Sequence, residues 1–110
     1  MPRYVPSRGD VIWLSFDPQA GHEQAGTRPA IVLSPKKYNG KTSLIIVCPI
    51  TSKIKGYPFE VRLVGRKIDG VILSDQVKSF NWRARKAQLI EQANPDAVSE
   101  VQEKLLLLLQ

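Results

Sequence analysis

The chain has 110 residues, the length of one domain, with 16 Lys and Arg against 10 Asp and Glu and a formal net charge of +6. Its single cysteine, Cys48, excludes a disulfide framework and favours a reducing, cytoplasmic location. Apolar runs such as residues 105–109 are far shorter than the about 20 residues of a membrane span, so we expect no membrane association.

The charge is distributed unevenly along the chain. Residues 91–110 hold four acidic side chains against Lys104 alone and carry a charge of −3, so residues 1–90 carry +9. A basic body of this kind favours a polyanionic partner such as a nucleic acid, although simple solubility accounts for the same charge.

Residues 10–16 and 28–33 predict the first two strands. The first, D-V-I-W-L-S-F, is rich in β-branched and aromatic residues and ends before Pro18. The second contains Pro29, which cannot donate to a ladder and should therefore lie at the start of the strand or on an edge. The intervening residues 19–27 have two glycines and no periodicity, which predicts a long loop of the kind that often carries binding residues.

The middle of the chain predicts further short strands. Residues 34–41 are a polar connector with room for one helical turn, and the continuously apolar residues 43–50 predict a buried central strand. The next segments are, in order, a turn (51–57), a half-buried antiparallel strand (59–63), a turn (65–70), a strand (71–77), a segment without an assignment (79–85) and a short strand (87–92).

A C-terminal helix from about Pro95 to Leu107 is the clearest element. Asn94 is a favoured N-cap, Pro95 suits the first helical position, and apolar residues recur at spacings of three and four, at positions 97, 101, 105 and 108. Short strands followed by one helix predict a mainly β domain, a compact antiparallel barrel or strongly twisted sheet that the helix caps.

Several chemistries lack the residues that they need. The single histidine, His22, and the single Cys48 cannot supply a zinc site, and no nucleotide-binding glycine motif is present, so we expect no metal and no cofactor. Arginine, lysine and hydroxyl side chains near strand ends suit phosphate recognition instead. Such a site can cleave RNA without a metal, because the 2′-hydroxyl attacks its own phosphorus and the protein need only orient the strand, stabilise charge and assist proton transfer.

Residues 21–35, G-H-E-Q-A-G-T-R-P-A-I-V-L-S-P, closely resemble the loop and second strand of the MazF/PemK family of toxins. R-Y-V-P at residues 3–6, K-G-Y-P-F-E-V at 55–61 and D-G-V-I-L-S-D-Q-V-K-S-F-N-W-R-A-R at 69–85 fit the same family in order and spacing. The resemblance implies one toxin domain over residues 1–110 with a small SH3-like (PemK/CcdB-like) antiparallel barrel and a C-terminal helix.

The resemblance also implies an activity and partners. It indicates a sequence-specific, metal-independent endoribonuclease that cuts single-stranded mRNA, leaves a 2′,3′-cyclic phosphate and a 5′-hydroxyl, and inhibits translation and growth. The family acts as a homodimer with RNA across the interface, and a cognate MazE-like antitoxin blocks the groove with an acidic tail.

Site residues are carried over position by position. Arg28 matches the catalytic arginine of the family, and Thr51 matches the hydroxyl that works beside it. The positions that match RNA contacts are Glu23, Gln24, Lys55, Asp75, Gln76 and Lys78.

Structural interpretations of the same residues remain open. Arg28 can form an ion pair with Glu23 or Asp75, and Thr51 can cap a local turn. Trp82 is followed by Arg83 and Arg85 in a pattern that can stack on bases, but packing in a core or dimer contact is the favoured interpretation. Thr27 and His22 receive no role.

Two other functions compete with RNA cleavage. A gyrase poison of the CcdB type catalyses nothing and depends on a tryptophan-containing tail, whereas this sequence ends in L-L-L-L-L-Q. A non-catalytic nucleic-acid-binding barrel would account for the charge alone. Incubation with RNA in excess EDTA separates the three, because only the endoribonuclease cuts.

Overall fold

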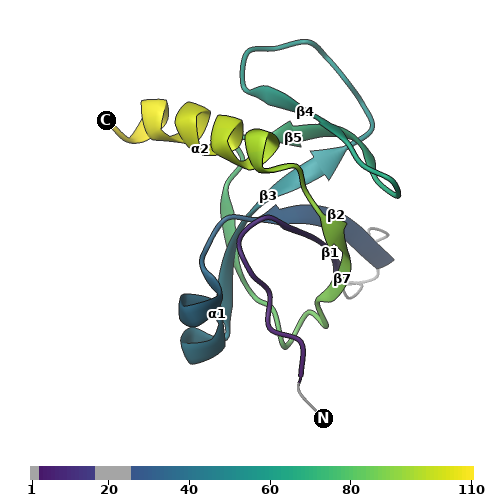
Figure 1. Ribbon diagram of the computed structural model, residues 1–110, viewed down its shortest axis with the longest axis vertical. Helices are drawn as coiled ribbons and strands as arrows, with labels where there is room; N and C mark the ends of the chain where they lie inside the picture. The colour runs from purple at the N-terminus through teal and green to yellow at the C-terminus, as the bar shows by residue number, and fades with distance from the viewer. Residues whose placement is uncertain (1–2, 17–25) are drawn as a thin grey trace, which may run out of the picture.

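The computed structural model describes residues 3–16 and 26–110 (Figure 1). Nine elements lie within these residues, namely β1 (Asp10–Phe16), β2 (Gly26–Val32), α1 (Lys36–Thr42), β3 (Leu44–Thr51), β4 (Glu60–Val64), β5 (Asp69–Leu73), β6 (Lys78–Asn81), β7 (Gln88–Gln92) and α2 (Pro95–Leu109).

The strands form one curled antiparallel sheet with α2 lying across one end of it (Figure 1). The strand order is β4-β5-β3-β2-β1-β7, and β6 pairs with β3 beside this path. The predicted mainly β fold with a C-terminal helix is therefore confirmed. Within the described residues, no helix has the length and apolar character needed to cross a membrane.

The central strands are buried on both faces, which explains why their sequence is apolar almost without interruption. Side chains that alternate along β1, β2 and β3 enter two separate clusters. One cluster, which includes Val11, Ile31 and Cys48, is covered by Ala97, Val98 and Val101 of α2. The other lies on the opposite side of these strands and comprises Ile12, Leu14, Ala30, Val32, Ile45, Val47 and Trp82.

Strand β3 changes its partner halfway along one edge. Leu44–Val47 pairs with β6, whereas Ile50 and Thr51 pair with β5. The two ladders diverge around Pro49, which has no N–H group to leave unpaired at the gap. This fork in the sheet is where a cavity with polar lining residues opens.

Most predicted strands are confirmed, but β2 begins at Gly26, inside the predicted loop 19–27, and β5 begins at Asp69, inside the predicted turn 65–70. The prediction of a strand over residues 71–77 is wrong beyond Leu73, because the chain turns there: Gln76 N–H donates to the Leu73 carbonyl at 3.1 Å. Residues 79–85, left without an assignment, contain most of β6 and a following turn. Pro29 lies in the middle of β2 instead of at its start and pairs with Trp13 of β1, but it is one residue beyond the last β2–β3 pair, Ala30 with Pro49.

Cys48 is fully buried, and burial raises the pKa of its thiol to about 12. The thiol therefore stays protonated and acts as a small core side chain.

Helix α2 begins as predicted: the Asn94 side chain accepts the Asp96 N–H at 2.8 Å. Its later turns differ from the prediction, since Leu108 is 50% exposed instead of packed on the sheet.

Glu91 on β7 fastens the β4–β5 turn to the rest of the sheet. Its carboxylate accepts the backbone N–H groups of Arg66, Lys67 and Ile68 at 2.9, 3.1 and 2.9 Å. These hydrogen bonds, led by that from Ile68, lower the pKa of Glu91 below its ordinary value.

We expect Glu91→Gln to lower the thermal unfolding midpoint at about pH 7, because an uncharged amide binds three N–H donors less well than a carboxylate. The folded pKa is depressed, so the contribution of the carboxylate is complete above the ordinary value of 4.5 and is lost as the pH falls below it. Calorimetry across this range should show the two proteins converging in acid.

Glu103→Gln is the matched control, because Glu103 is an exposed carboxylate on α2. Equal midpoints for the two variants at neutral pH, or a Glu91→Gln deficit that is independent of pH, would contradict the role given to Glu91.

Candidate active site

A cavity of about 400 Å³ opens at the fork where β3 leaves β6 for β5. Its floor is apolar and belongs largely to the second core cluster, through Leu14, Ala30, Val47 and Phe80. Its polar lining residues come from three different parts of the chain and are Arg28, Thr51, Gln76 and Lys78. Four of the residues that the sequence singled out are therefore neighbours around one hollow.

The register of the sheet explains why Arg28 and Thr51 meet. Ala30 on β2 pairs with Pro49 on β3, and the same antiparallel register, continued for two residues, brings Arg28 opposite Thr51. Arg28 also pairs directly with Leu14 on β1. Because side chains alternate along a strand, Arg28 shares its face with Ala30, and Thr51 shares its face with Pro49. Both side chains consequently reach the same cavity.

The Thr51 hydroxyl does cap a local turn, as one structural interpretation of the sequence expected. Its oxygen accepts the Lys53 N–H at 3.1 Å. This bond uses a lone pair and leaves the hydroxyl proton able to donate. The turn thus orients the hydroxyl of a half-buried residue at the cavity edge, which makes the capping and the catalytic interpretations compatible.

The cavity is electropositive. Among the described residues, its lining includes Arg28 and Lys78 and no carboxylate. The guanidinium of Arg28 and the ammonium of Lys78 stand over an apolar floor, where charges are less screened than in bulk water. An anionic, partly apolar ligand such as a nucleotide segment fits this combination.

Two other predicted contacts lie outside the cavity lining, and one of them, Asp75, is next to the lining residue Gln76. Lys55 is exposed in the β3–β4 segment, residues 52–59, and its backbone N–H donates to Glu60 at 2.9 Å. Asp75 precedes Gln76 in the β5–β6 turn, where Oδ1 accepts the Tyr57 hydroxyl at 2.8 Å. Predicted contacts Glu23 and Gln24, together with His22, lie outside the described residues.

Sequence reasoning missed Phe80, whereas the core interpretation of Trp82 is confirmed. Phe80 lines the cavity, and the Arg85 guanidinium lies 4.9 Å from the centroid of its ring. The signal was available in the alternation along β6, which puts residues 78 and 80 on one face. Trp82 is a buried core residue whose indole N–H donates to the Asn39 carbonyl at 2.8 Å, with Arg83 stacked on its ring.

The fold and the sequence together identify the protein family to which the chain belongs. A profile of the PemK-like, MazF-like toxins of type II toxin–antitoxin systems matches residues 7–109, and the chain belongs to this family. It is a homologue of the endoribonuclease toxin MazF of Escherichia coli K12, with 51% identity over 107 residues that cover 97% of this chain and 96% of the other.

Two more relatives agree with this assignment. The Escherichia coli endoribonuclease PemK is 34% identical over 99 residues, which cover 86% of this chain and 74% of PemK. A chain in the crystal structure of the MazE–MazF complex (Form-II) from Deinococcus radiodurans superposes with a TM-score of 0.93 at 52% identity and 97% coverage of both chains. The resemblance found in the sequence is confirmed over nearly the whole chain.

Proposed function

We propose that this chain is a metal-independent endoribonuclease that cleaves single-stranded mRNA and serves as the toxin of a type II toxin–antitoxin system. The observation that carries the proposal is the meeting of Arg28 and Thr51 at one cavity, whose lining also includes Lys78. The endoribonuclease activity of the relatives MazF and PemK supports it.

The reaction needs only groups that this site offers, together with water. The 2′-hydroxyl of one nucleotide loses its proton to water as its oxygen attacks the adjacent phosphorus, the P–O5′ bond breaks, and the 5′-oxygen takes up a proton from water, which gives a 2′,3′-cyclic phosphate and a 5′-hydroxyl. The Arg28 fork binds the phosphate oxygens as their negative charge increases. The Thr51 hydroxyl donates a hydrogen bond to the same group, oriented by the bond that it accepts from Lys53.

Neighbouring residues hold the RNA strand. Lys78 and Lys55 neutralise backbone phosphates, and Gln76 contacts a sugar or base at the cavity rim. The Phe80 ring in the floor provides an apolar surface for a base. Glu23 and Gln24, matched to RNA-approaching positions of the family, complete the proposed set of contacts.

Replacing Arg28 separates catalysis from binding. We expect Arg28→Ala to slow cleavage by ~100- to 1,000-fold, because removing one oriented donor from a developing oxyanion costs about 3–4 kcal/mol. Binding of uncleaved RNA should weaken far less. Arg28→Lys should restore part of the rate, because it keeps the charge and loses the two-pronged geometry. Single-turnover cleavage and RNA titration measure the two effects.

Substitutions of Thr51 test the role of its hydroxyl in cleavage. Thr51→Ser keeps the hydroxyl and should retain most of the rate, whereas Thr51→Val keeps the shape and should lose as much as Thr51→Ala. An Arg28→Ala protein that is folded and cuts RNA at the parent rate would refute this site. RNA that is bound tightly but never cut by the parent would favour the non-catalytic alternative.

The proposed partner is an acidic, MazE-like antitoxin that covers the basic cavity, in the cytoplasm where both chains and the mRNA are present. The solved complexes of MazE with MazF from Deinococcus radiodurans support this pairing. Charge complementarity agrees with it, since the body of this chain is basic.

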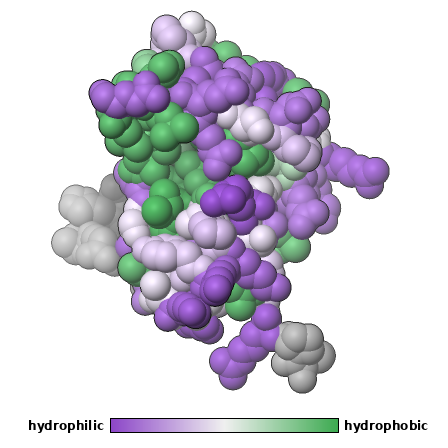
Figure 2. Space-filling model, turned by 60° about the vertical axis from the view of Figure 1, so that its left-hand side comes forward, coloured by the Kyte–Doolittle hydropathy of each residue, from purple (hydrophilic) through white to green (hydrophobic). Residues whose placement is uncertain are grey.

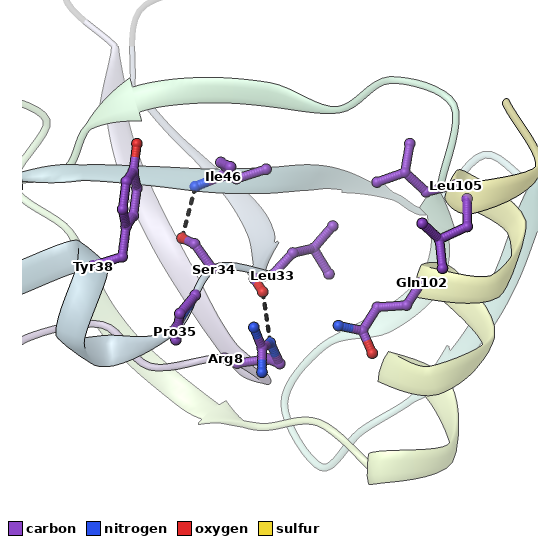
Figure 3. Close-up of a pocket in the computed structure, with 9 residues that line it drawn as sticks. Arg8, Leu33, Ser34, Pro35, Tyr38, Ile46, Gln102 and Leu105 are labelled. Carbon is purple, nitrogen blue, oxygen red and sulfur yellow. Dashed lines mark hydrogen bonds between the residues drawn. The ribbon is translucent and has the colours of Figure 1, made fainter. Parts of the chain in front are cut away.

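We also propose a homodimer that forms through an apolar groove away from the cavity. The groove, of about 600 Å³, lies between α1, β3 and α2 and includes Tyr38, Ile46 and Leu106 (Figure 3). Arg8 and Ser34 give it fixed walls, because Arg8 donates to the Leu33 carbonyl and Ser34 accepts the Ile46 N–H, at 2.8 and 2.9 Å. Figure 2 shows apolar side chains gathered on one face, and Leu106–Leu109 at the end of α2 are each at least half exposed.

We expect sedimentation to show a dimer at micromolar concentration and Leu106→Glu to convert it to a monomer, because the new carboxylate would be buried without a partner. Val64→Glu is the matched control: Val64 is 71% exposed and lies on β4, outside the groove. A monomeric parent, or equal dissociation of the two variants, would contradict this interface.

A further inference from the structure

Tyr57 joins two segments that border the cavity. Its hydroxyl donates to Asp75 Oδ1 at 2.8 Å, and so connects the β3–β4 segment with the β5–β6 turn. The first segment begins directly after Thr51, and the second contains Gln76, both of which line the cavity. A backbone bond from Ser74 N–H to the Phe59 carbonyl at 3.0 Å lies alongside this link.

The rest of the β3–β4 segment is held just as firmly. The two carboxylate oxygens of Glu60 accept the N–H groups of Lys55 and Gly56, each at 2.9 Å. Gly56 has a φ of 83°, which other residues rarely adopt, so this turn depends on glycine. Lys104 of α2 donates to the Pro58 carbonyl at 2.6 Å. The segment is therefore a fixed rim rather than a free loop.

The Tyr57 hydroxyl keeps the proton with which it donates its hydrogen bond to Asp75. Partial burial, and then the hydrogen bond and charge of Asp75, raise the pKa of the Tyr57 phenol above its ordinary value. The phenol stays protonated, and Asp75 stays an acceptor with one oxygen engaged. The second oxygen, Oδ2, is thereby oriented on an exposed residue next to Gln76.

A carboxylate beside a phosphate-binding cavity does not suit the backbone of RNA, which it repels. It suits the edge of a base, because a carboxylate accepts hydrogen bonds from the amino groups of cytosine, adenine or guanine, and uracil has no such group. A base is discriminated well only if the acceptor is held in place.

We propose that Tyr57 determines specificity by orienting Asp75, whose carboxylate then selects a base with an exocyclic amino group near the cleaved bond. Tyr57 is a positioning residue, and Asp75 contacts the base. The inference rests on the proposed RNA substrate and adds to it a chemical class of base at one position.

The test uses short RNAs that vary one nucleotide at a time and carry a 2′-deoxy sugar at the cleaved position, so that binding is measured without cleavage. At one position, the parent should bind an amino-bearing base roughly tenfold more tightly than uracil. Tyr57→Phe should lose most of this preference at that position alone. Sequencing of the fragment ends from a long RNA should show the same relaxation.

Two further variants make the result decisive. Tyr4→Phe also removes a tyrosine–aspartate bond, from Tyr4 to Asp10 at 2.6 Å, but lies outside the cavity lining, and should lower stability without changing base preference. Asp75→Asn can still accept from Tyr57, yet presents an amide in place of the carboxylate, and should lose the preference for amino-bearing bases.

The results of these experiments test the role of Tyr57 and the proposed RNA cleavage separately. A Tyr57→Phe protein that weakens binding equally for every sequence, or changes nothing, overturns this inference, as does an Asp75→Asn protein that keeps the preference. A parent that shows the base preference but never cuts RNA would refute the proposed catalysis and leave the role of Tyr57 standing.

Discussion

The change of partner along β3 is the constraint on which the site depends. Up to Val47 this strand is paired with β6, and from Ile50 onward with β5, so the two ladders must separate around Pro49. The separation leaves a hollow whose floor is core and whose walls are strand ends. Because successive side chains of the central strands enter opposite core clusters, a shift of register by one residue would exchange the two sets of side chains, disrupt both clusters and remove Arg28 and Thr51 from the cavity.

The site combines a rigid apolar floor with polar groups that are oriented by short local bonds. Thr51 is oriented by Lys53 N–H, and the β3–β4 segment is held by Glu60 and Tyr57. Catalysis by charge stabilisation requires such preorganisation, because donors that must rearrange lose most of their advantage. The proposed cleavage and the base specificity assigned to Asp75 thus rely on the same feature. In both, the polar groups near the cavity are held in place by hydrogen bonds within the protein.

The sequence predicted what local chemistry determines. Strand β1 and the start of α2 were found because β-branched residues and an Asn-Pro cap act within a few residues. The β5–β6 turn was missed because the apolar residues 71–73 and Val77 were assigned to one strand across the polar residues 74–76, and pairing with distant β3 decides where the strand ends. Arg28 and Thr51 were chosen by family resemblance, but their apposition follows from the β2–β3 register. Phe80 was overlooked because its place in the cavity depends on the pairing of β6 with β3.

The most direct test of the central claim uses an RNA oligonucleotide with one 2′-deoxy substitution at the cleaved nucleotide, in excess EDTA. The account predicts that the unsubstituted RNA is cut to a fragment with a 5′-hydroxyl, and that the substituted RNA is bound with similar affinity and stays intact, since the attacking oxygen is missing. Cleavage of the substituted RNA, or a requirement for added metal, would contradict the account.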